Sequence, residues 1–423
     1  MYKKTVLPNG LRVITHDMKE RDSIALGLWI GVGGRYEEGH WQGAAHFLEH
    51  IVFKGSRKYS CEEIKALIEG VGGSLNAFTS EEQTCFYAKI PSKHLHQTFD
   101  VLADMVFSPE ITRRDVLKES TVIVEEIKMY HDLPQYFVLE LLDELIWPDH
   151  PLGRSLSGTA ETVTRMSNRD LRKFHEMYYS PGNIVVSATG HLKHEQMVTL
   201  VNKRLGHIQK DGQWDYQKAE NNQTRPRARF FKKNIEQMHL SLGMLGYDER
   251  HKDRYVLGLL SIILGGNMSS RLFVELREKR GLAYSISSST KSLHDTGLFL
   301  IRGGIDVAKA VEAVGLILAE LNKIKRYGVN QSEFMRAKDY LLGQLLLGLE
   351  DSLDHMLWLG EALISKNEMT TLQDVIREFK KITREDIKRV AKEIFDARHF
   401  NLALVGPITD EQQRKIGALL GLG

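Results

Sequence analysis

The sequence has few cysteines, no apolar run long enough for a membrane span and almost no excess of either charge. Two cysteines among 423 residues, Cys61 and Cys85, exclude a disulfide framework and favour a reducing compartment. The longest apolar run, residues 256–266, has about half of the roughly 20 residues that a membrane span requires, and is typical of a buried helix. Lys plus Arg number 57 and Asp plus Glu 55, so neither nucleic acid nor a membrane surface is an expected partner.

The N-terminal residues 1–17, "MYKKTVLPNGLRVITHD", lack the apolar stretch and the small-residue cleavage site of an export signal. They pass directly into alternating, strand-like sequence. We therefore expect a cytoplasmic protein. With 423 residues the chain is also long enough for two or more domains, each with its own core.

The first half of the chain combines strand-like and helical patterns. Two apolar strands come first, followed by a short helical pattern, a hairpin rich in β-branched and aromatic residues, two long helices and a buried strand. In order, these segments are "LRVITHD", "SIALGLWIGVGGRYE", "AAHFLEHIVF", "GSLNAFTSEEQTCFYAKIP", "HLHQTFDVLADMVF", "VLKESTVIVEEIKMYHDL" and "NIVVSATG".

The second half repeats this order with a strand, an apolar helix, a hairpin, two amphipathic helices and a last strand. The segments are "QMHLSLGMLGY", "RYVLGLLSIILGG", "LAYSISSSTKSLHDTGLFLIRGGI", "AKAVEAVGLILAELNKI", "QSEFMRAKDYLLGQLLLGL" and "NLALVGPI". The repetition predicts an α+β fold in which one unit is duplicated, each copy being a mostly antiparallel sheet covered by helices.

A polar stretch with few apolar anchors and a proline separates the halves, between Gly206 and Arg229. We therefore predict an N-terminal domain at 1–211, a linker at 212–229 and a C-terminal domain at 230–423. Of the two copies, the first alone carries a pair of histidines at helical spacing.

This pair lies in "AAHFLEH", where His46 and His50 would stand one helical turn apart on the same face. Imidazoles at this spacing can bind one metal ion, and zinc lowers the pKa of its bound water to about 7. Glu49, adjacent to His50, could place its carboxylate beside such a water as a general base. The pattern H-x-x-E-H is the inverzincin signature, but a solvated helix face can present the same residues by chance.

The segment 118–130, "KESTVIVEEIKMY", offers a third ligand. At helical period, Glu119 and Glu126 fall on the same mostly apolar face as Val122 and Ile123. A buried carboxylate needs a partner, because an unpaired charge in an apolar setting is costly. A metal ion held with two histidines is one such partner, and a buried arginine is the alternative.

Together, "HFLEH" and "VIVEEIKMY", with Glu126 76 residues after His50, resemble the zinc site of the M16 metallopeptidases, the family of insulysin, pitrilysin and the mitochondrial processing peptidase. The duplicated halves and the length resemble its half-size bacterial M16B, processing-protease-like branch over essentially the whole chain. The resemblance implies two homologous α/β-sandwich domains of the LuxS/MPP-like metallohydrolase type, with one Zn²⁺ in the catalytic domain. It implies His46, His50 and Glu126 as zinc ligands, Glu49 as catalytic base and Glu119 as a supporting carboxylate.

Two further segments resemble parts of the family's substrate site. "GGSLNAFTSEEQT" resembles the edge strand that takes up a peptide as an added strand, with Asn76, Ala77 and Phe78 at the matching positions. "LREKRGLAYSI" resembles the segment whose Arg and Tyr, here Arg277 and Tyr284, reach toward the zinc site and hold the oxyanion and the substrate backbone. The residues alone are equally compatible with Phe78 as a core aromatic, and favour a surface arginine and a core tyrosine for the other two.

At one position the chain departs from the family pattern. Many relatives have Arg after the supporting glutamate, where this chain has Ser120, so the charge arrangement around Glu119 is expected to differ.

The implied function is a zinc endopeptidase that cuts extended peptides or unfolded segments inside a closed dimeric chamber. The alternatives are a non-catalytic M16-like subunit that binds peptides or assembles a complex, and an α+β repeat protein without stoichiometric zinc. Half-size members of the family pair their subunits, so a dimer is implied. The sequence does not choose between a homodimer and a heterodimer with a paralogue.

Overall fold

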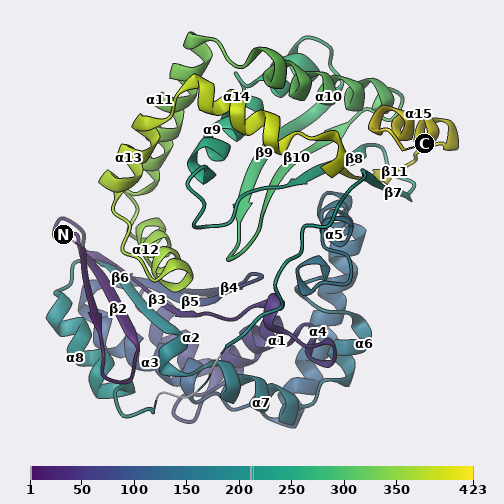
Figure 1. Ribbon diagram of the computed structural model, residues 1–423. Helices are drawn as coiled ribbons and strands as arrows, with labels where there is room; N and C mark the ends of the chain where they lie inside the picture. Colours follow the sequence, from purple (N-terminus) through teal and green to yellow (C-terminus); the bar gives the residue numbers. More distant parts are fainter. Residues whose placement is uncertain (1, 210–211, 213, 423) are drawn as a thin grey trace. The chain divides into compact units, whose positions relative to one another are not determined.

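The computed structural model describes residues 2–209, 212 and 214–422 (Figure 1). The chain forms two compact units, and neither is continuous in sequence. The first unit contains the residues up to Ile127 together with Arg154–Gln217 and Leu345–Thr371, and the second contains Lys128–Gly153, Lys218–Gln344 and the residues from Leu372 onward.

Each unit is built on one sheet, and the two sheets share the same strand order except that the first has an additional edge strand, β1. The first sheet runs β1-β2-β6-β3-β5-β4 and the second β7-β11-β8-β10-β9. Among the described strands, β2–β6 and β7–β11 pair in parallel and every other pair is antiparallel. The duplicated, mostly antiparallel α+β unit predicted from the sequence is therefore confirmed. The strands are β1 Tyr2–Val6, β2 Arg12–Asp17, β3 Ser23–Ile30, β4 Ser74–Thr79, β5 Thr84–Pro91, β6 Ile184–Gly190, β7 Arg227–Lys232, β8 Met238–Leu245, β9 Ala283–Ser292, β10 Gly297–Ile305 and β11 Asn401–Gly406.

The central strands read as continuous apolar runs because helices cover both faces of each sheet. In β3, Leu26 and Leu28 belong to the core beneath one face, whereas Trp29 belongs to a smaller cluster on the other face with Leu359 and Leu363. In the first unit α3 and α8 cover the first of these faces and α12 covers the second (Figure 1). The helices that lie wholly or mainly in this unit are α1 Ala44–Ile51, α2 Cys61–Glu69, α3 Leu95–Phe107, α4 Arg113–Asp132, α6 Ala160–Arg165, α7 Asn168–Tyr178, α8 His194–Leu205 and α12 Ser352–Lys366.

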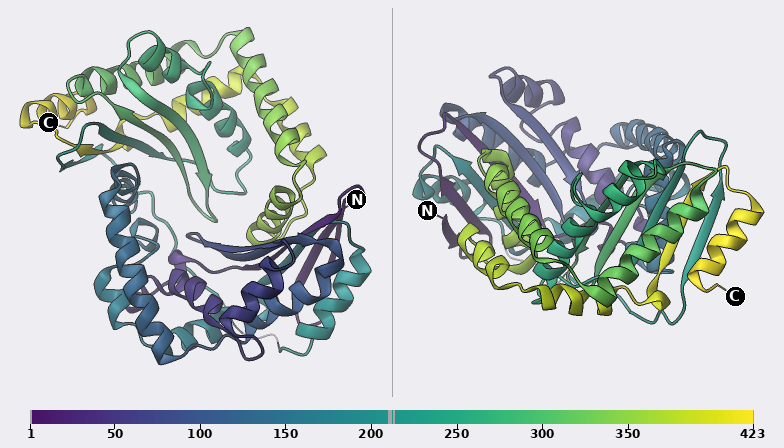
Figure 2. Two further views of the ribbon diagram at one scale, coloured as in Figure 1. Left: turned by 180° about the vertical axis from the view of Figure 1, so that it is seen from behind. Right: turned by 90° about the horizontal axis from the view of Figure 1, so that it is seen from above.

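The second unit repeats this layering around its own sheet. The apolar run predicted as a buried helix forms α9, which packs against β9 and β10. Helix α14 contacts α9, and α10 contacts α14. Figure 2 shows β9 and β10 as the long green hairpin of this sheet. The remaining helices are α5 Pro134–Ile146, α9 Arg254–Gly265, the π-helix η7 Phe273–Glu278, α10 Ala310–Tyr327, α11 Gln331–Gly348, α13 Leu372–Lys381, α14 Arg384–Ile394 and α15 Asp410–Leu420.

Two helices at corresponding places in the repeat are exchanged between the halves. Helix α5 follows the first half's long helices but packs on β8 and β11, and α12 follows those of the second half but packs on β3 and β6. A glycine makes room in each strand: a Cβ on Gly27 would meet Met356 of α12, and one on Gly243 would meet Leu142 and Ile146 of α5.

The predicted domains, 1–211 and 230–423, follow the repeat in the sequence, whereas the compact units differ from them by this exchange. Strand β7 begins at Arg227, inside the predicted linker 212–229. Residues 210, 211 and 213, at the predicted boundary, lie outside the described residues. Within the described ranges, no helix combines the length and apolar character needed to cross a membrane.

Candidate metal centre and active site

The helix that carries the histidine pair is anchored by a buried carboxylate at its N-terminus. Glu37, 4% exposed, accepts hydrogen bonds from the backbone N–H groups of Gly43 (2.7 Å) and Ala45 (2.8 Å). These N–H groups have no partner within α1, and a negative charge there is favoured by the helix dipole. Phe47 and Leu48 are fully buried, so the histidines face away from the core.

Three side chains from two helices converge in the first unit. The Nε2 atom of His46 lies 3.7 Å from Oε1 of Glu126, and Nε2 of His50 lies 3.4 Å from Oε2 of the same carboxylate. One ligand atom from each of the three lies within 4.8 Å of the others. Two imidazoles and a carboxylate form a donor set that suits Zn²⁺ in a site with an open coordination position. The residues therefore fit a zinc ion.

A second carboxylate, that of Glu119, contacts the Nδ1 side of the His50 ring. Glu119, 3% exposed, has Oε2 3.3 Å from Nδ1 of His50 and Oε1 2.6 Å from Nζ of Lys54. A carboxylate on the outer nitrogen of a metal-binding histidine fixes its tautomer and ring orientation. Lys54 supplies the positive charge that a buried Glu119 needs.

The glutamate between the histidines is held by a residue of the edge strand. The hydroxyl of Thr79, the last residue of β4, donates a 2.6 Å hydrogen bond to Oε2 of Glu49. Burial raises the pKa of Glu49, and this hydrogen bond opposes the shift. A carboxylate with a raised pKa is suited to accepting a proton near neutral pH.

The two histidines have opposite pKa shifts. Burial, followed by the neighbouring His50, lowers the pKa of His46 to about 4, so the ring is neutral at physiological pH, as a metal ligand must be. Burial also opposes the charged form of His50, but the carboxylates of Glu126 and Glu119 outweigh it and raise its pKa.

The predicted substrate residues lie on β4, at the end of the first sheet. Asn76, Ala77 and Phe78 pair with Tyr87, Phe86 and Cys85 of β5, and the sheet order places no strand on the other side of β4 among the described residues. Asn76 is exposed, and its Oδ1 accepts a 2.8 Å hydrogen bond from the Ala77 N–H. The ring of Phe78 packs edge-on against Trp29, with centroids 5.6 Å apart, so Phe78 has a packing role whatever else it does.

Arg277 and Tyr284 lie side by side in the second unit. The Arg277 guanidinium lies 5.6 Å from the centre of the Tyr284 ring and 4.9 Å from that of Phe273. Arg277 belongs to the π-helix η7, and Tyr284 is the extra residue where the β9–β10 register shifts at a bulge. Both features are common at functional sites. Tyr284 is 73% exposed, so the core position that the residues alone favour for it is wrong.

Sequence reasoning did not find three of the residues that hold this site. Glu37 acts on the nearby N-terminus of α1. Lys54 and Thr79 act on Glu119 and Glu49 through contacts between segments farther apart in sequence. No local pattern marks them, although Lys54 follows the second histidine by one helical turn.

The predicted inward face of α4 is partly wrong. Glu119 and Ile123 are buried as expected, and Glu126 is half-buried. Val122, however, is 45% exposed and Ser120 is buried in its place. The buried stripe on the helix is therefore rotated slightly from the one that the apolar residues suggest.

We expect Lys54→Met to weaken zinc binding about tenfold, the lower end of the range for residues that orient a metal ligand. Loss of the ammonium leaves the buried Glu119 carboxylate without its ion-pair partner and free to leave His50. The zinc dissociation constant, measured by competition with a chelating dye, is the readout. Lys54→Arg should restore most of the affinity. Lys65→Met, at an exposed position on α2, is the control, and equal affinities for the two Met variants would remove Lys54 from the site.

Comparisons with known proteins agree on one family. Residues 12–160 match the family described as insulinase (peptidase family M16), and residues 165–341 match the family described as the peptidase M16 inactive domain. Two relatives named as uncharacterized zinc proteases are similar over almost their whole length. YmxG of Bacillus subtilis is 35% identical, covering 96% of this chain and 98% of its own. The Streptomyces coelicolor relative is 34% identical, covering 98% of this chain and 91% of its own.

Solved structures show the same fold. A protease from Helicobacter pylori has a TM-score of 0.90 at 25% identity, covering 96% of this chain and 99% of its own. A Pseudomonas fluorescens structure described as a peptidase M16 inactive domain has a TM-score of 0.89 at 19% identity, covering 97% and 98%. The fold and site thus define a duplicated α+β protein with a potential zinc-binding H-x-x-E-H helix. The chain belongs to the M16 peptidase family.

Proposed function

We propose that the protein is a zinc-dependent endopeptidase that cleaves extended peptides or unfolded segments. The observation that carries the proposal is the convergence of His46 and His50 of α1 with Glu126 of α4 within 4.8 Å. Helix α1 also carries the half-buried Glu49. The names of the relatives as zinc proteases support it.

In this mechanism His46, His50 and Glu126 hold the metal and Glu49 acts as the base. A bound zinc ion would act as a Lewis acid and lower the pKa of a water molecule. Glu49 takes up the proton of the attacking water and passes it to the leaving amine. The Thr79 hydroxyl keeps the Glu49 carboxylate in place, and Glu119 orients the His50 ring.

The edge strand β4 supplies the peptide-binding surface. A substrate in extended conformation can pair with the outer backbone groups of Asn76, Ala77 and Phe78, as an added strand of the first sheet. Main-chain pairing reads no side chains, so many sequences are acceptable. Because Thr79 ends this strand and contacts Glu49, strand pairing places the substrate next to the base.

The function is tested by metal analysis together with digestion of a peptide library. We expect one zinc per chain, cleavage of unstructured peptides, loss of cleavage after chelation and recovery on adding zinc. Folded proteins should resist cleavage, because their strands are already paired. Stoichiometric zinc without cleavage of any peptide would support a non-catalytic peptide-binding subunit, and absence of zinc would support a structural repeat protein.

The remaining predicted residues lead to a proposal about assembly. Arg277 and Tyr284 are exposed neighbours in the second unit. In that unit the helix corresponding to α1 is α9, which contains no histidine. We place them opposite the zinc site of a second subunit, in a homodimer that closes around the substrate. There a guanidinium and a phenol would stabilise the oxyanion that forms when the peptide carbonyl is attacked.

Mixing two inactive variants tests this arrangement. If the pair acts across subunits, a mixed dimer of Glu49→Gln and Tyr284→Phe has one site with both defects and one intact site. Activity should then return to about half the wild-type value per mixed dimer, measured with a fluorogenic peptide after mass spectrometry has shown subunit exchange. Activity that stays at the level of the separate variants would place the pair in its own chain's site, and a fully active monomer would exclude the dimer.

A further inference from the structure

The second unit contains a pocket at one end of α5 that shares Tyr284 with the proposed mechanism but whose other residues have no role in it. Its volume is about 430 Å³, the size of a small-molecule or short-peptide site. Residues from the first turns of α5, from β8 and from the β9–β10 hairpin line it. They are Gln135, Tyr136, Val138, Gln237, His239, Leu240, Tyr284, Ser285, Ser287, Arg302, Gly303 and Gly304.

The strand register explains how polar groups gather there. Arg302 of β10 lies opposite Ser287 of β9 and Ser241 of β8, and Gly304 lies opposite His239. Because alternate residues of a strand share a face, Arg302 and Gly304 lie on the same side of the sheet as these cross-strand partners. That side is the one against which α5 packs.

The glycine keeps this pocket open. A Cβ on Gly304 would lie 3.0 Å from the Gln237 side-chain oxygen and 3.5 Å from the Ser285 hydroxyl, both pocket residues. Glycine in the interior of a strand often marks the close approach of a ligand.

The pocket combines an unpaired cation with an absence of acidic groups. The Arg302 side chain is exposed and forms no ion pair or hydrogen bond within the described part of the chain, and the residues lining the pocket include no aspartate or glutamate. Across the β8–β10 pair, the Ser241 hydroxyl is fully buried and has no hydrogen-bond partner among the described residues. His239 likewise has none, and burial lowers its pKa.

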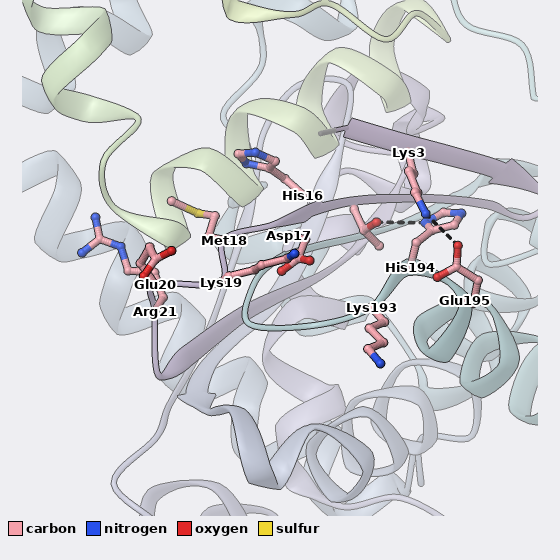
Figure 3. A pocket seen from close by; sticks show the side chains of 11 residues that line it. Lys3, His16, Asp17, Met18, Lys19, Glu20, Arg21, Lys193, His194 and Glu195 are labelled. Carbon is pink, nitrogen blue, oxygen red and sulfur yellow. Dashed lines mark hydrogen bonds and ion pairs between the residues drawn. The ribbon is translucent and has the colours of Figure 1, made fainter.

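Two other pockets in the described part of the chain do not share this character. The neighbouring pocket of the second unit contains Glu236 and Asp306. A larger one in the first unit, of about 880 Å³, has both signs of charge, and there Lys3 pairs with Glu195 at 2.7 Å (Figure 3). Of the three pockets compared, the α5 pocket alone has an unpaired guanidinium with hydroxyl and amide neighbours and no acidic residue.

We propose that this pocket binds a carboxylate of the peptide substrate, with Arg302 as its charge partner and the Ser287 hydroxyl as a further donor. The inference rests on the proposed function for the nature of the ligand. A guanidinium binds a carboxylate through two parallel hydrogen bonds. The carboxylate can come from the free C-terminus of the peptide or from an aspartate or glutamate side chain.

The test measures binding rather than cleavage. Fluorescence anisotropy with the full-length Glu49→Gln protein compares three labelled peptides of one sequence. The first has a free C-terminus and no acidic side chain, the second has a C-terminal amide, and the third has the amide and one internal aspartate. Each peptide is then measured with the Glu49→Gln protein that also carries Arg302→Gln. The control carries Arg336→Gln instead, which removes the same charge at an exposed position of α11.

We expect the second peptide, which has no carboxylate, to bind about tenfold more weakly than at least one of the two peptides that carry one. Loss of one charged hydrogen-bond partner has an effect of this size. The free-acid peptide retaining affinity identifies the C-terminus as the ligand, and the aspartate peptide retaining it identifies a side chain. Arg302→Gln should remove the difference and Arg336→Gln should preserve it. Gly304→Val, which fills the pocket without changing charge, should also remove it.

Equal binding of all three peptides, or a preference that survives Arg302→Gln, would overturn the inference. Both results are separate from the proposed function. A wild-type protein that prefers carboxylates but cleaves nothing keeps the pocket and rejects the peptidase. One that cleaves peptides without any carboxylate preference keeps the peptidase and rejects the pocket.

Discussion

Glu49→Gln should abolish peptide cleavage while zinc stays bound. The substitution preserves the shape of the side chain and leaves an amide oxygen to accept the Thr79 hydroxyl. The amide cannot take up a proton, and general-base catalysis is typically worth about 10²- to 10⁴-fold. Both histidines and Glu126 remain, so metal content should not change. Turnover of a fluorogenic peptide and zinc content by mass spectrometry are measured on the same preparation.

The control for this variant is Glu62→Gln, which makes the same chemical change at an exposed position of α2. It should retain both cleavage and zinc. Near-normal turnover in Glu49→Gln would remove Glu49 from the mechanism. Loss of zinc in that variant would make Glu49 a ligand, and the assignment of Glu126 would then need revision.

The repetition in the sequence predicted most strands of the two sheets because those strands leave a local signal, but it did not predict β1 and it placed the start of β7 in the linker. The central strands are buried on both faces, so they appear as short apolar runs, and both hairpins carry β-branched and aromatic residues. The order β6-β3-β5-β4 recurs as β11-β8-β10-β9, in agreement with the repeated order of patterns.

The exchange of α5 and α12 could not be predicted in this way. An amphipathic helix has the same pattern whichever sheet it covers, so nothing in residues 134–146 or 352–366 indicates that they pack on the other half's strands. Gly27 and Gly243, which make room for these helices, can be seen in the sequence. A glycine within a strand, however, does not indicate which helix packs on it.

The candidate ligands were accessible to sequence reasoning because their spacing is helical. His46 and His50 are one turn apart, and Glu119 and Glu126 are two turns apart on another helix. The contacts that hold these groups join segments far apart in the chain, such as Lys54 with Glu119. Such contacts require the fold, because many lysines and threonines are present and no spacing distinguishes the ones involved.

Glu126→Gln should lower zinc affinity by more than the 10- to 100-fold typical of residues that only orient a ligand. The carboxylate of Glu126 lies close to both imidazoles, 3.7 Å from Nε2 of His46 and 3.4 Å from Nε2 of His50. Replacing a charged oxygen ligand by a neutral amide weakens the bond to the ion and leaves the site with one fewer negative charge. Zinc dissociation constants from chelator competition are the measurement.

The adjacent Glu125 gives the matched control, because it has the same side chain on the same helix but points to solvent. Glu125→Gln should bind zinc like the wild type. The zinc affinity of Glu119→Gln should fall between those of the other two variants, because Glu119 acts on the metal only through His50. In this variant the ion pair with Lys54 becomes a weaker hydrogen bond. The expected order of zinc loss is therefore Glu126, Glu119, Glu125. Equal losses at 125 and 126 would mean that the α4 carboxylates act through general charge rather than by coordination, and complete metal loss at 119 alone would make that residue the direct ligand.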